Sequence, residues 1–447
     1  MAEAVAGGVV RRIFGNLGRL VTGKAAAGLI GLAYMVLAAR DLGPSDYGVL
    51  VLVHSFATTV GGIVEFPGWH AVVRYGAHHQ ASDEPHGLMK LLRFVGTVEL
   101  TAGVLAVITA AVLGPLLGPG LGWSATALAF AVPYSLAVLG SVRSTAAGYL
   151  QLRGRFDLLG IHNVVAPAAR LVGAVIVIAT ETGFIGFLIA WLVAALLEWA
   201  SLWTMAWLVA RQHLAGVPVR GAIQGVRAEN PGIWRFMIAA NADVTFSELA
   251  GRIAPLVIGW MLGPAAVGLY AIAQRATVVI AQPAQILGQA AYAELARLVA
   301  AGDHGQRLRR AVLHCVLIAI AAAVPVILIL AFFSREIAGL IGGPSFTGAA
   351  SVMVWLTAAR ALMLAGPPAS SALIALGRPS LSVAANVVAS LGLLPLLPLL
   401  IQYYGLDAAG WHAVFQAALG SAILIILVLR ESRRAGEAAN PLAARCV

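Results

Sequence analysis

Residues 42–50 read Leu-Gly-Pro-Ser-Asp-Tyr-Gly-Val-Leu, and residues 262–270, about 220 residues later, read Leu-Gly-Pro-Ala-Ala-Val-Gly-Leu-Tyr. A second pair of segments matches at nearly the same offset: Gly154-Arg155 with Asn163-Val164-Val165-Ala166 recurs as Gly377-Arg378 with Asn386-Val387-Val388-Ala389. Leu-Gly-Pro alone is a common turn. Two pairs at a near-constant offset indicate an internal duplication.

The composition identifies the class of protein to which this duplicated chain belongs. Of the 447 residues, 60% are hydrophobic and only 11% are charged, and the mean hydropathy is +0.89. A soluble domain carries roughly 25% charged residues, so this chain cannot cover a water-facing surface of its size. Apolar stretches long enough to cross a hydrocarbon core of about 30 Å recur along its whole length. Since lipid offers no partner to free backbone groups, these stretches are predicted to be helices.

We therefore predict an all-α polytopic membrane protein of about twelve transmembrane helices. The predicted spans are 17–40, 46–68, 91–115, 123–148, 158–180, 184–210, 233–262, 264–293, 308–333, 347–370, 381–403 and 408–430.

The duplicated segments fall at matching places in two halves of six helices each. Because six is an even number, both halves enter the membrane in the same sense, which predicts parallel repeats related by an axis along the membrane normal. The predicted parts are an N-terminal six-helix lobe at 1–210, a basic cytoplasmic linker at 211–232, a C-terminal six-helix lobe at 233–430 and a cytoplasmic tail at 431–447.

The net charge of +10 follows a membrane pattern. Apart from six inside the predicted helices, the basic residues lie near helix ends, with Arg40 and Arg335 on one side of the membrane and the others on the opposite side. Positive residues stay cytoplasmic, so we expect both termini inside, no cleaved signal peptide and no nucleic-acid partner. Two cysteines, Cys315 and Cys446, exclude a disulfide framework and a cysteine metal site. We expect no cofactor, no metal and no catalytic residue.

The segment 38–55, AARDLGPSDYGVLVLVHS, and the segment 68–77, GWHAVVRYGA, resemble the start of polysaccharide-biosynthesis flippases. These are the O-antigen and lipid-linked-oligosaccharide translocases of the multidrug/oligosaccharidyl-lipid/polysaccharide exporter superfamily. The segment 262–276, LGPAAVGLYAIAQRA, matches the glycine-tyrosine stretch that recurs in the same family.

The resemblance implies a V-shaped, MATE-like transporter whose lobes enclose a central cavity. It further implies that a polyprenyl-diphosphate-linked oligosaccharide is moved by alternating access across the bacterial inner membrane, for lipopolysaccharide or another surface polysaccharide. The partners implied are the lipid-linked sugar, the lipid bilayer, and the polysaccharide polymerase and chain-length machinery.

Charged residues inside the predicted helices are candidate site residues, because a charge at the bilayer centre costs about 2.5–3.5 kcal/mol on insertion scales. Guanidinium groups suit a diphosphate, whose oxygens they bind bidentately. Four polar residues of one helix, starting at Arg275, also share one face that lipid would not tolerate. The candidates for substrate binding are Lys24, Arg170, Arg252, Arg275, Gln282, Gln285, Gln289 and Arg360.

Each of these predictions has a structural alternative. Glu248 and Arg252 are four residues apart in the favourable order for a pair within one helix, the glutamines are equally compatible with hydrogen bonds between helices, and Lys24 lies close enough to the interface to reach it. The acids that we predict as candidates for ion coupling are Asp243, Glu248, Glu65 and Glu99.

Two other functions compete with a flippase. A cation-coupled multidrug exporter of the same superfamily would need an acidic cavity, whereas cations predominate here. A membrane-embedded polysaccharide polymerase or ligase would need a sizeable outer loop with catalytic residues, whereas the longest outer loop, 334–346, offers only Arg335 and Glu336. A structural partner of a biosynthetic complex, without transport of its own, is a third alternative.

Overall fold

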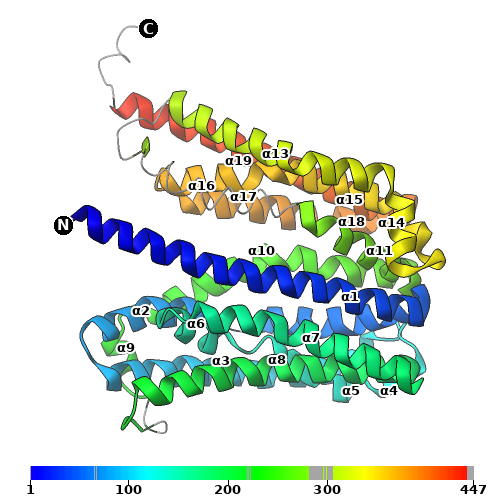
Figure 1. Ribbon diagram of the computed structural model, residues 1–447, viewed down its shortest axis with the longest axis horizontal. Helices are drawn as coiled ribbons and strands as arrows, with labels where there is room; N and C mark the ends of the chain where they lie inside the picture. The colour runs from blue at the N-terminus through cyan, green and yellow to red at the C-terminus, as the bar shows by residue number, and fades with distance from the viewer. Residues whose placement is uncertain are drawn as a thin grey trace. The chain divides into compact units, whose positions relative to one another are not determined.

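The computed structural model describes residues 2–64, 66, 68–218, 221, 223–280, 295, 298–299 and 306–439, without the side chains of residues 2–21, 242–244, 246–248, 250, 279, 379 and 435–439. Throughout these ranges the chain forms helices joined by turns, and they contain no strand (Figure 1). The predicted all-α class is confirmed.

Contacts divide the chain into two compact units. Unit 1 contains Met1–Leu42 and Val49–Thr245, and unit 2 contains Gly43–Gly48 and Phe246–Val447. Helix α10 (Ile233–Leu262) contributes to both units. The segment 211–232, which the sequence predicts as a linker between lobes, falls within unit 1.

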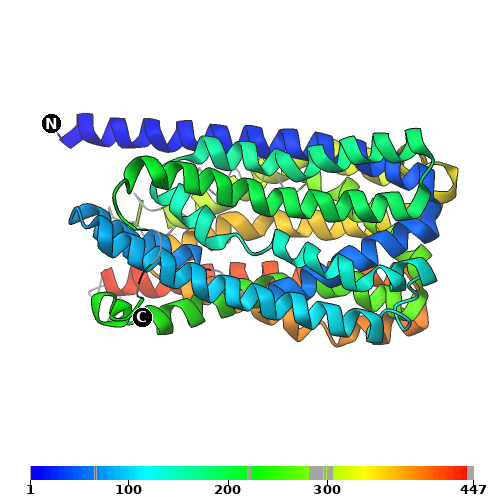
Figure 2. The same ribbon diagram turned by 90° about the horizontal axis from the view of Figure 1, so that it is seen from below.

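Unit 1 is built mainly from long apolar helices, of which α7 and α8 lie side by side in both views (Figures 1 and 2). Its elements are α1 (Ala2–Val64), α2 (Trp69–Ala81), α3 (Pro85–Leu117), α4 (Ala125–Ala129), α5 (Ala131–Tyr134), η1 (Ser135–Gly140), α6 (Ser144–Leu152), α7 (Phe156–Thr180), α8 (Gly183–His213) and α9 (Val226–Glu229). One buried apolar cluster joins α2, α3, α6 and α8 to the start of α10.

Unit 2 repeats the pattern of long helices interrupted by short ones. Its further elements are α11 (Pro264–Thr277), η2 (Val278–Ile280), α13 (Gln306–Phe332), α14 (Ser334–Gly342), η3 (Pro344–Ala349), α15 (Ala350–Leu362), η4 (Met363–Ala365), α16 (Gly366–Ala375), α17 (Pro379–Gly392), α18 (Leu396–Tyr404) and α19 (Asp407–Ala439). A second apolar cluster packs α13, α16 and α17 against α19.

Among the described residues, seven helices are long and apolar enough to cross a membrane, or eight if the bent pair α17–α18 is one span. The prediction of about twelve is larger partly because α1 contains two predicted spans, on either side of a kink at Gly43. In addition, seven side chains of the span 233–262 and residues 281–293 of the span 264–293 lie outside the described part of the chain that this count covers.

The predicted continuous span 123–148 is wrong, because the chain there forms α4, α5, η1 and α6 in succession. The break before α6 is held by a buried side chain of α3. The Glu99 carboxylate accepts hydrogen bonds from the backbone N–H groups of Ser144 and, at 2.7 Å, of Thr145. These are the donors that the first turn of a helix leaves unpaired, so Glu99 caps α6 from a distance in sequence.

The two Leu-Gly-Pro segments have the same backbone conformation and contact each other. Gly43 has φ 69° and ψ 177°, and Gly263 has φ 83° and ψ 174°, a region essentially restricted to glycine. A Cβ on Gly48 would overlap the carbonyl group of Pro264, and a Cβ on Gly268 would overlap that of Pro44. Such a reciprocal contact is expected where a two-fold axis passes between equivalent segments.

Candidate functional site

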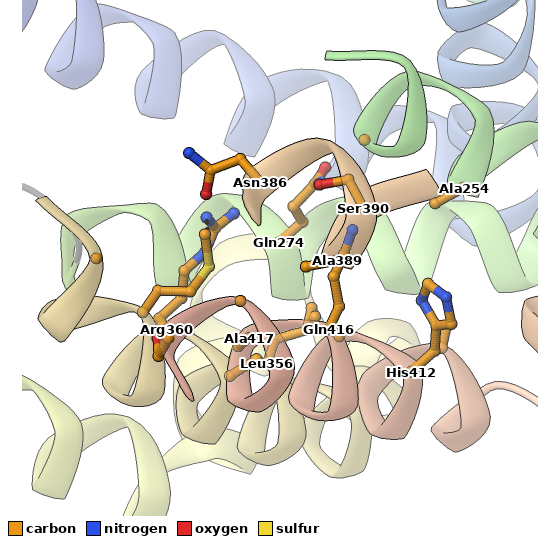
Figure 3. A pocket seen from close by; sticks show the side chains of 18 of the residues that line it. Ala254, Gln274, Leu356, Arg360, Asn386, Ala389, Ser390, His412, Gln416 and Ala417 are labelled. Carbon is orange, nitrogen blue, oxygen red and sulfur yellow. Dashed lines mark hydrogen bonds between the residues drawn. The ribbon is translucent and has the colours of Figure 1, made fainter. Parts of the chain in front are cut away.

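Unit 2 contains a cavity of about 750 Å³, within the usual size range of small-molecule sites. Its walls come from α10, α11, α15, η4, α16, α17, α18 and α19, and every lining residue belongs to unit 2 (Figure 3). On α19 the lining residues recur every three or four positions, as one face of a helix should. They are Ala409, His412, Ala413, Gln416, Ala417, Gly420, Ser421 and Leu424.

The charged groups of this cavity are cationic. Arg252 of α10 and Arg360 of α15 both line it, and no Asp or Glu lies among its described lining residues. Arg360 lies in the last turn of α15, where the helix dipole favours a positive charge. The contact found for its guanidinium is weak, with Nη1 4.0 Å from the Met363 sulfur.

The neutral polar groups of the cavity fall into two sets. Ser421 donates to the carbonyl of Leu362 at 2.7 Å, and Ser370 pairs with Ser382 outside the lining at 2.6 Å. By contrast, the side chains of Gln274, Ser390 and Gln416 line the cavity without a hydrogen bond to any described residue. These three side chains are therefore open to a bound molecule.

Unit 1 contains a different cationic cluster around Arg170 of α7. The guanidinium donates to the Tyr34 hydroxyl at 3.2 Å and to Nε2 of His54 at 2.9 Å. It also lies 4.6 Å from the centre of the Trp191 ring, a favourable cation–π geometry. Since Nε2 accepts, Nδ1 of His54 carries the proton and donates to the Tyr134 hydroxyl at 3.1 Å.

A second polar cluster of unit 1 is an ion pair between Arg143 and Glu198. His162 lies 3.2 Å from Arg143 through Nε2 and 3.1 Å from Ser201 through Nδ1. In this network and in the cap by Glu99, charged side chains within the apolar helices contact partners from the protein itself. We therefore interpret both as contacts that stabilise the fold.

The structure brings together only part of the predicted site. Arg252 and Arg360 meet in the cavity of unit 2, and Arg170 lies in unit 1. Lys24 is exposed, and Arg275 is half-buried but does not line the cavity. The side chains that lie outside the described residues are Gln282, Gln285, Gln289, Asp243, Glu248 and Glu65.

Sequence reasoning missed Gln274, Ser390, His412 and Gln416. The signal was present for α19, where His412 and Gln416 are four residues apart in an otherwise apolar helix, on the face that carries the small residues. On α11, the sequence predicts that the face containing Arg275 lines the site. The residue that lines the cavity is instead its neighbour Gln274, which lies on an adjacent face of the same helix.

Known proteins share this fold. The chain matches a multidrug resistance MATE family transporter of the MOP superfamily in its inward-facing conformation, with 17% identity, a TM-score of 0.71 and coverage of 93% of this chain and 96% of that one. It matches the lipid II flippase MurJ in an inward closed conformation with 12% identity, a TM-score of 0.67 and coverage of 94% and 90%. At these identities the likeness shows the fold.

Two matches in sequence give the family. The inner membrane protein YghQ of Escherichia coli (strain K12) is 29% identical over 297 residues, which cover 66% of this chain and 82% of that protein. The family described as polysaccharide biosynthesis protein matches residues 36–351. Since that match spans well over half of the sequence, the chain belongs to the polysaccharide biosynthesis protein family.

Proposed function

We propose that the protein flips a polyprenyl-diphosphate-linked oligosaccharide across the bacterial inner membrane. The observation that carries this proposal is the cavity of unit 2, where two guanidiniums occur without an acidic side chain among the described lining residues. A cation in a membrane helix is costly unless a partner offsets it. The phosphate oxygens of a diphosphate would supply such a partner to Arg360.

The cavity also suits the sugar part of such a lipid. Open amide and hydroxyl side chains donate and accept hydrogen bonds, and sugar hydroxyls do the same. A cationic drug, the substrate expected of a multidrug exporter, would meet Arg252 and Arg360 instead of an acid. The charges of the cavity therefore favour the flippase over that alternative.

The location follows from the same proposal. A relative at 29% identity is named an inner membrane protein, and we propose the same membrane for this chain, with both termini and the segment 211–232 cytoplasmic. The six-helix lobes 1–210 and 233–430 would then alternate in exposing the substrate. Reporter fusions after residues 232 and 439 should both be active only as cytoplasmic reporters, and a periplasmic signal from either would refute this topology.

Reconstitution tests the function directly. Purified protein in liposomes should expose a fluorescent diphosphate-linked oligosaccharide lipid to an external quencher faster than empty liposomes do. Replacing both Arg252 and Arg360 by Gln should slow this step by about tenfold or more, because charge-assisted hydrogen bonds are lost. Arg335→Gln, an exposed arginine of α14, is the matched control.

The outcomes separate the candidate functions. A double variant as fast as the wild type would exclude this cavity as the substrate site. A wild type that leaves the lipid in place but exports a cationic dye would favour the multidrug exporter. The polymerase or ligase alternative predicts instead that the oligosaccharide changes in length, which mass spectrometry of the recovered lipid detects.

A further inference from the structure

The polar groups that Figure 3 labels differ in kind along the unit 2 cavity. Arg360 and Asn386 lie at one end and His412, near Ala254, at the other. Gln274, Ser390 and Gln416 lie between these ends. From Arg360 to the middle, the labelled groups thus change from a cation to neutral hydrogen-bonding side chains, and a ligand bound along this part of the cavity must change character in the same direction.

The neutral middle has hydrogen-bonding capacity that the protein does not use. Each glutamine amide offers two donors and one acceptor, and the Ser390 hydroxyl offers both functions. None of these three side chains bonds to another described residue. A ligand group that satisfies them needs donors and acceptors close together and no charge, which describes sugar hydroxyls and acetamido groups.

The far end adds an acceptor. Nε2 of His412 lies 2.9 Å from the carbonyl oxygen of Leu393, so this nitrogen carries the proton and donates it. Nδ1 of the neutral ring is then an acceptor, and it has no partner among the described residues. His412 is held in this orientation before any ligand binds, so Nδ1 can accept a hydrogen bond from a hydroxyl group at little conformational cost.

We infer that the cavity binds its substrate in one orientation, with the diphosphate at Arg360 and the first sugar against Gln274, Ser390 and Gln416. The inference rests on the proposed function and adds the residues that select the sugar. His412 lies near the start of α19, just after the interval between the predicted spans 381–403 and 408–430, which the predicted topology places on the outer side of the membrane. In this orientation the sugar lies nearer the outer side of the membrane than the diphosphate does, and the outer side is the one to which the proposed function delivers the sugar.

Binding to the purified full-length protein in detergent tests this orientation. The probes are a short-chain polyprenyl diphosphate and the same molecule with glucose, galactose or N-acetylglucosamine on its terminal phosphate, measured by calorimetry. At least one sugar-bearing probe should bind the wild type about three- to tenfold more tightly than the plain diphosphate, as one or two additional hydrogen bonds allow.

Three variants should remove that gain and leave the affinity for the plain diphosphate within about twofold of the wild type: Gln416→Leu, Gln274→Leu and Ser390→Ala. Arg360→Gln should weaken all probes by about tenfold or more, because it removes a charged partner. Gln402→Leu on the exposed face of α18 and Arg335→Gln are the matched controls. Melting of each variant without ligand distinguishes lost binding from lost folding.

Two results would overturn the inference: no sugar-bearing probe binds more tightly than the plain diphosphate, or the glutamine variants weaken both kinds of probe equally. The proposed function fails in a different way. In that case no probe binds the wild type, or the Arg360→Gln variant binds every probe as well as the wild type does.

Discussion

The reciprocal contact of the repeated glycines predicts how the protein responds to added methyl groups. A Cβ on Gly48 would lie 2.5 Å from the carbonyl carbon of Pro264, and one on Gly268 would lie 3.2 Å from that of Pro44. Ordinary contacts of this kind are 3.4–4 Å. The carbonyl oxygen lies nearer still in both cases, closer than real Cβ contacts, so Gly48→Ala and Gly268→Ala each require a backbone shift of roughly 1 Å or more.

The expected costs follow from these shifts. Overpacking costs about 1–3 kcal/mol, and more where backbone must move, so we expect about 3 kcal/mol or more for both Gly48→Ala and Gly268→Ala. Gly43→Ala meets no atom within 4 Å but has φ 69°, which costs about 1–3 kcal/mol in backbone strain. Gly28→Ala in the same helix meets nothing and has an ordinary φ, so it should be neutral or slightly stabilising.

Thermal unfolding of the four purified variants in detergent gives the test. Gly28→Ala, the control, should have the highest apparent melting temperature, Gly43→Ala should melt below it, and Gly48→Ala and Gly268→Ala should have the lowest melting temperatures. If Gly48→Ala melts together with Gly28→Ala, the close approach of the two repeated segments is wrong. The contact would then give no support to a duplicated scaffold.

Three further perturbations test the polar contacts of unit 1. Glu99→Ala should cost about 3 kcal/mol or more, because two buried backbone donors of α6 lose their acceptor; Glu99→Gln keeps one acceptor and should melt between Glu99→Ala and the wild type, whereas equal melting of all three would refute the cap. Glu198→Gln should destabilise the protein by about 1–3 kcal/mol by leaving half-buried Arg143 without its carboxylate; adding Arg143→Gln should recover part of the loss, and strictly additive losses would argue against the pair. Glu229→Lys should release the segment 211–232 from α3 by breaking its pair with Lys90 at 2.6 Å, and so speed limited proteolysis of that segment; Lys90→Glu added to it should restore resistance, and an unchanged cleavage rate in the single variant would count against this contact.

The sequence predicted the elements that depend on hydrophobicity. Predicted spans such as 158–180 and 184–210 agree closely with α7 and α8, because each is a long apolar run bounded by turn signals. The interruption between the predicted spans 17–40 and 46–68 agrees with the kink at Gly43, since Gly43 and Pro44 lie between two apolar runs. These features need only local information.

Features that depend on contacts across the fold could not be predicted in this way. The span 123–148 is apolar enough to form one helix, and its break depends on Glu99, a residue more than forty positions away whose carboxylate caps α6. Hydrophobicity marked Glu99 as a candidate for ion coupling, yet its described contacts are those of a cap. Gln274 lines the cavity and Arg275 does not because of how α11 is rotated about its axis. A periodic pattern in the sequence predicts that rotation only to within about one residue.

Comparison of three intramembrane arginines shows why the cavity of unit 2 is the better candidate site. Arg143 has the carboxylate of Glu198, and Arg170 has a hydroxyl, an imidazole nitrogen and the face of Trp191. In both cases the protein itself offsets part of the cost of a charge in a membrane helix. Among the described residues, Arg360 makes a 4.0 Å contact to a thioether and an electrostatic interaction with Tyr270, and the described lining of its cavity supplies no acid. This contrast with Arg143 and Arg170 supports the proposal that an anionic ligand offsets the charge of Arg360.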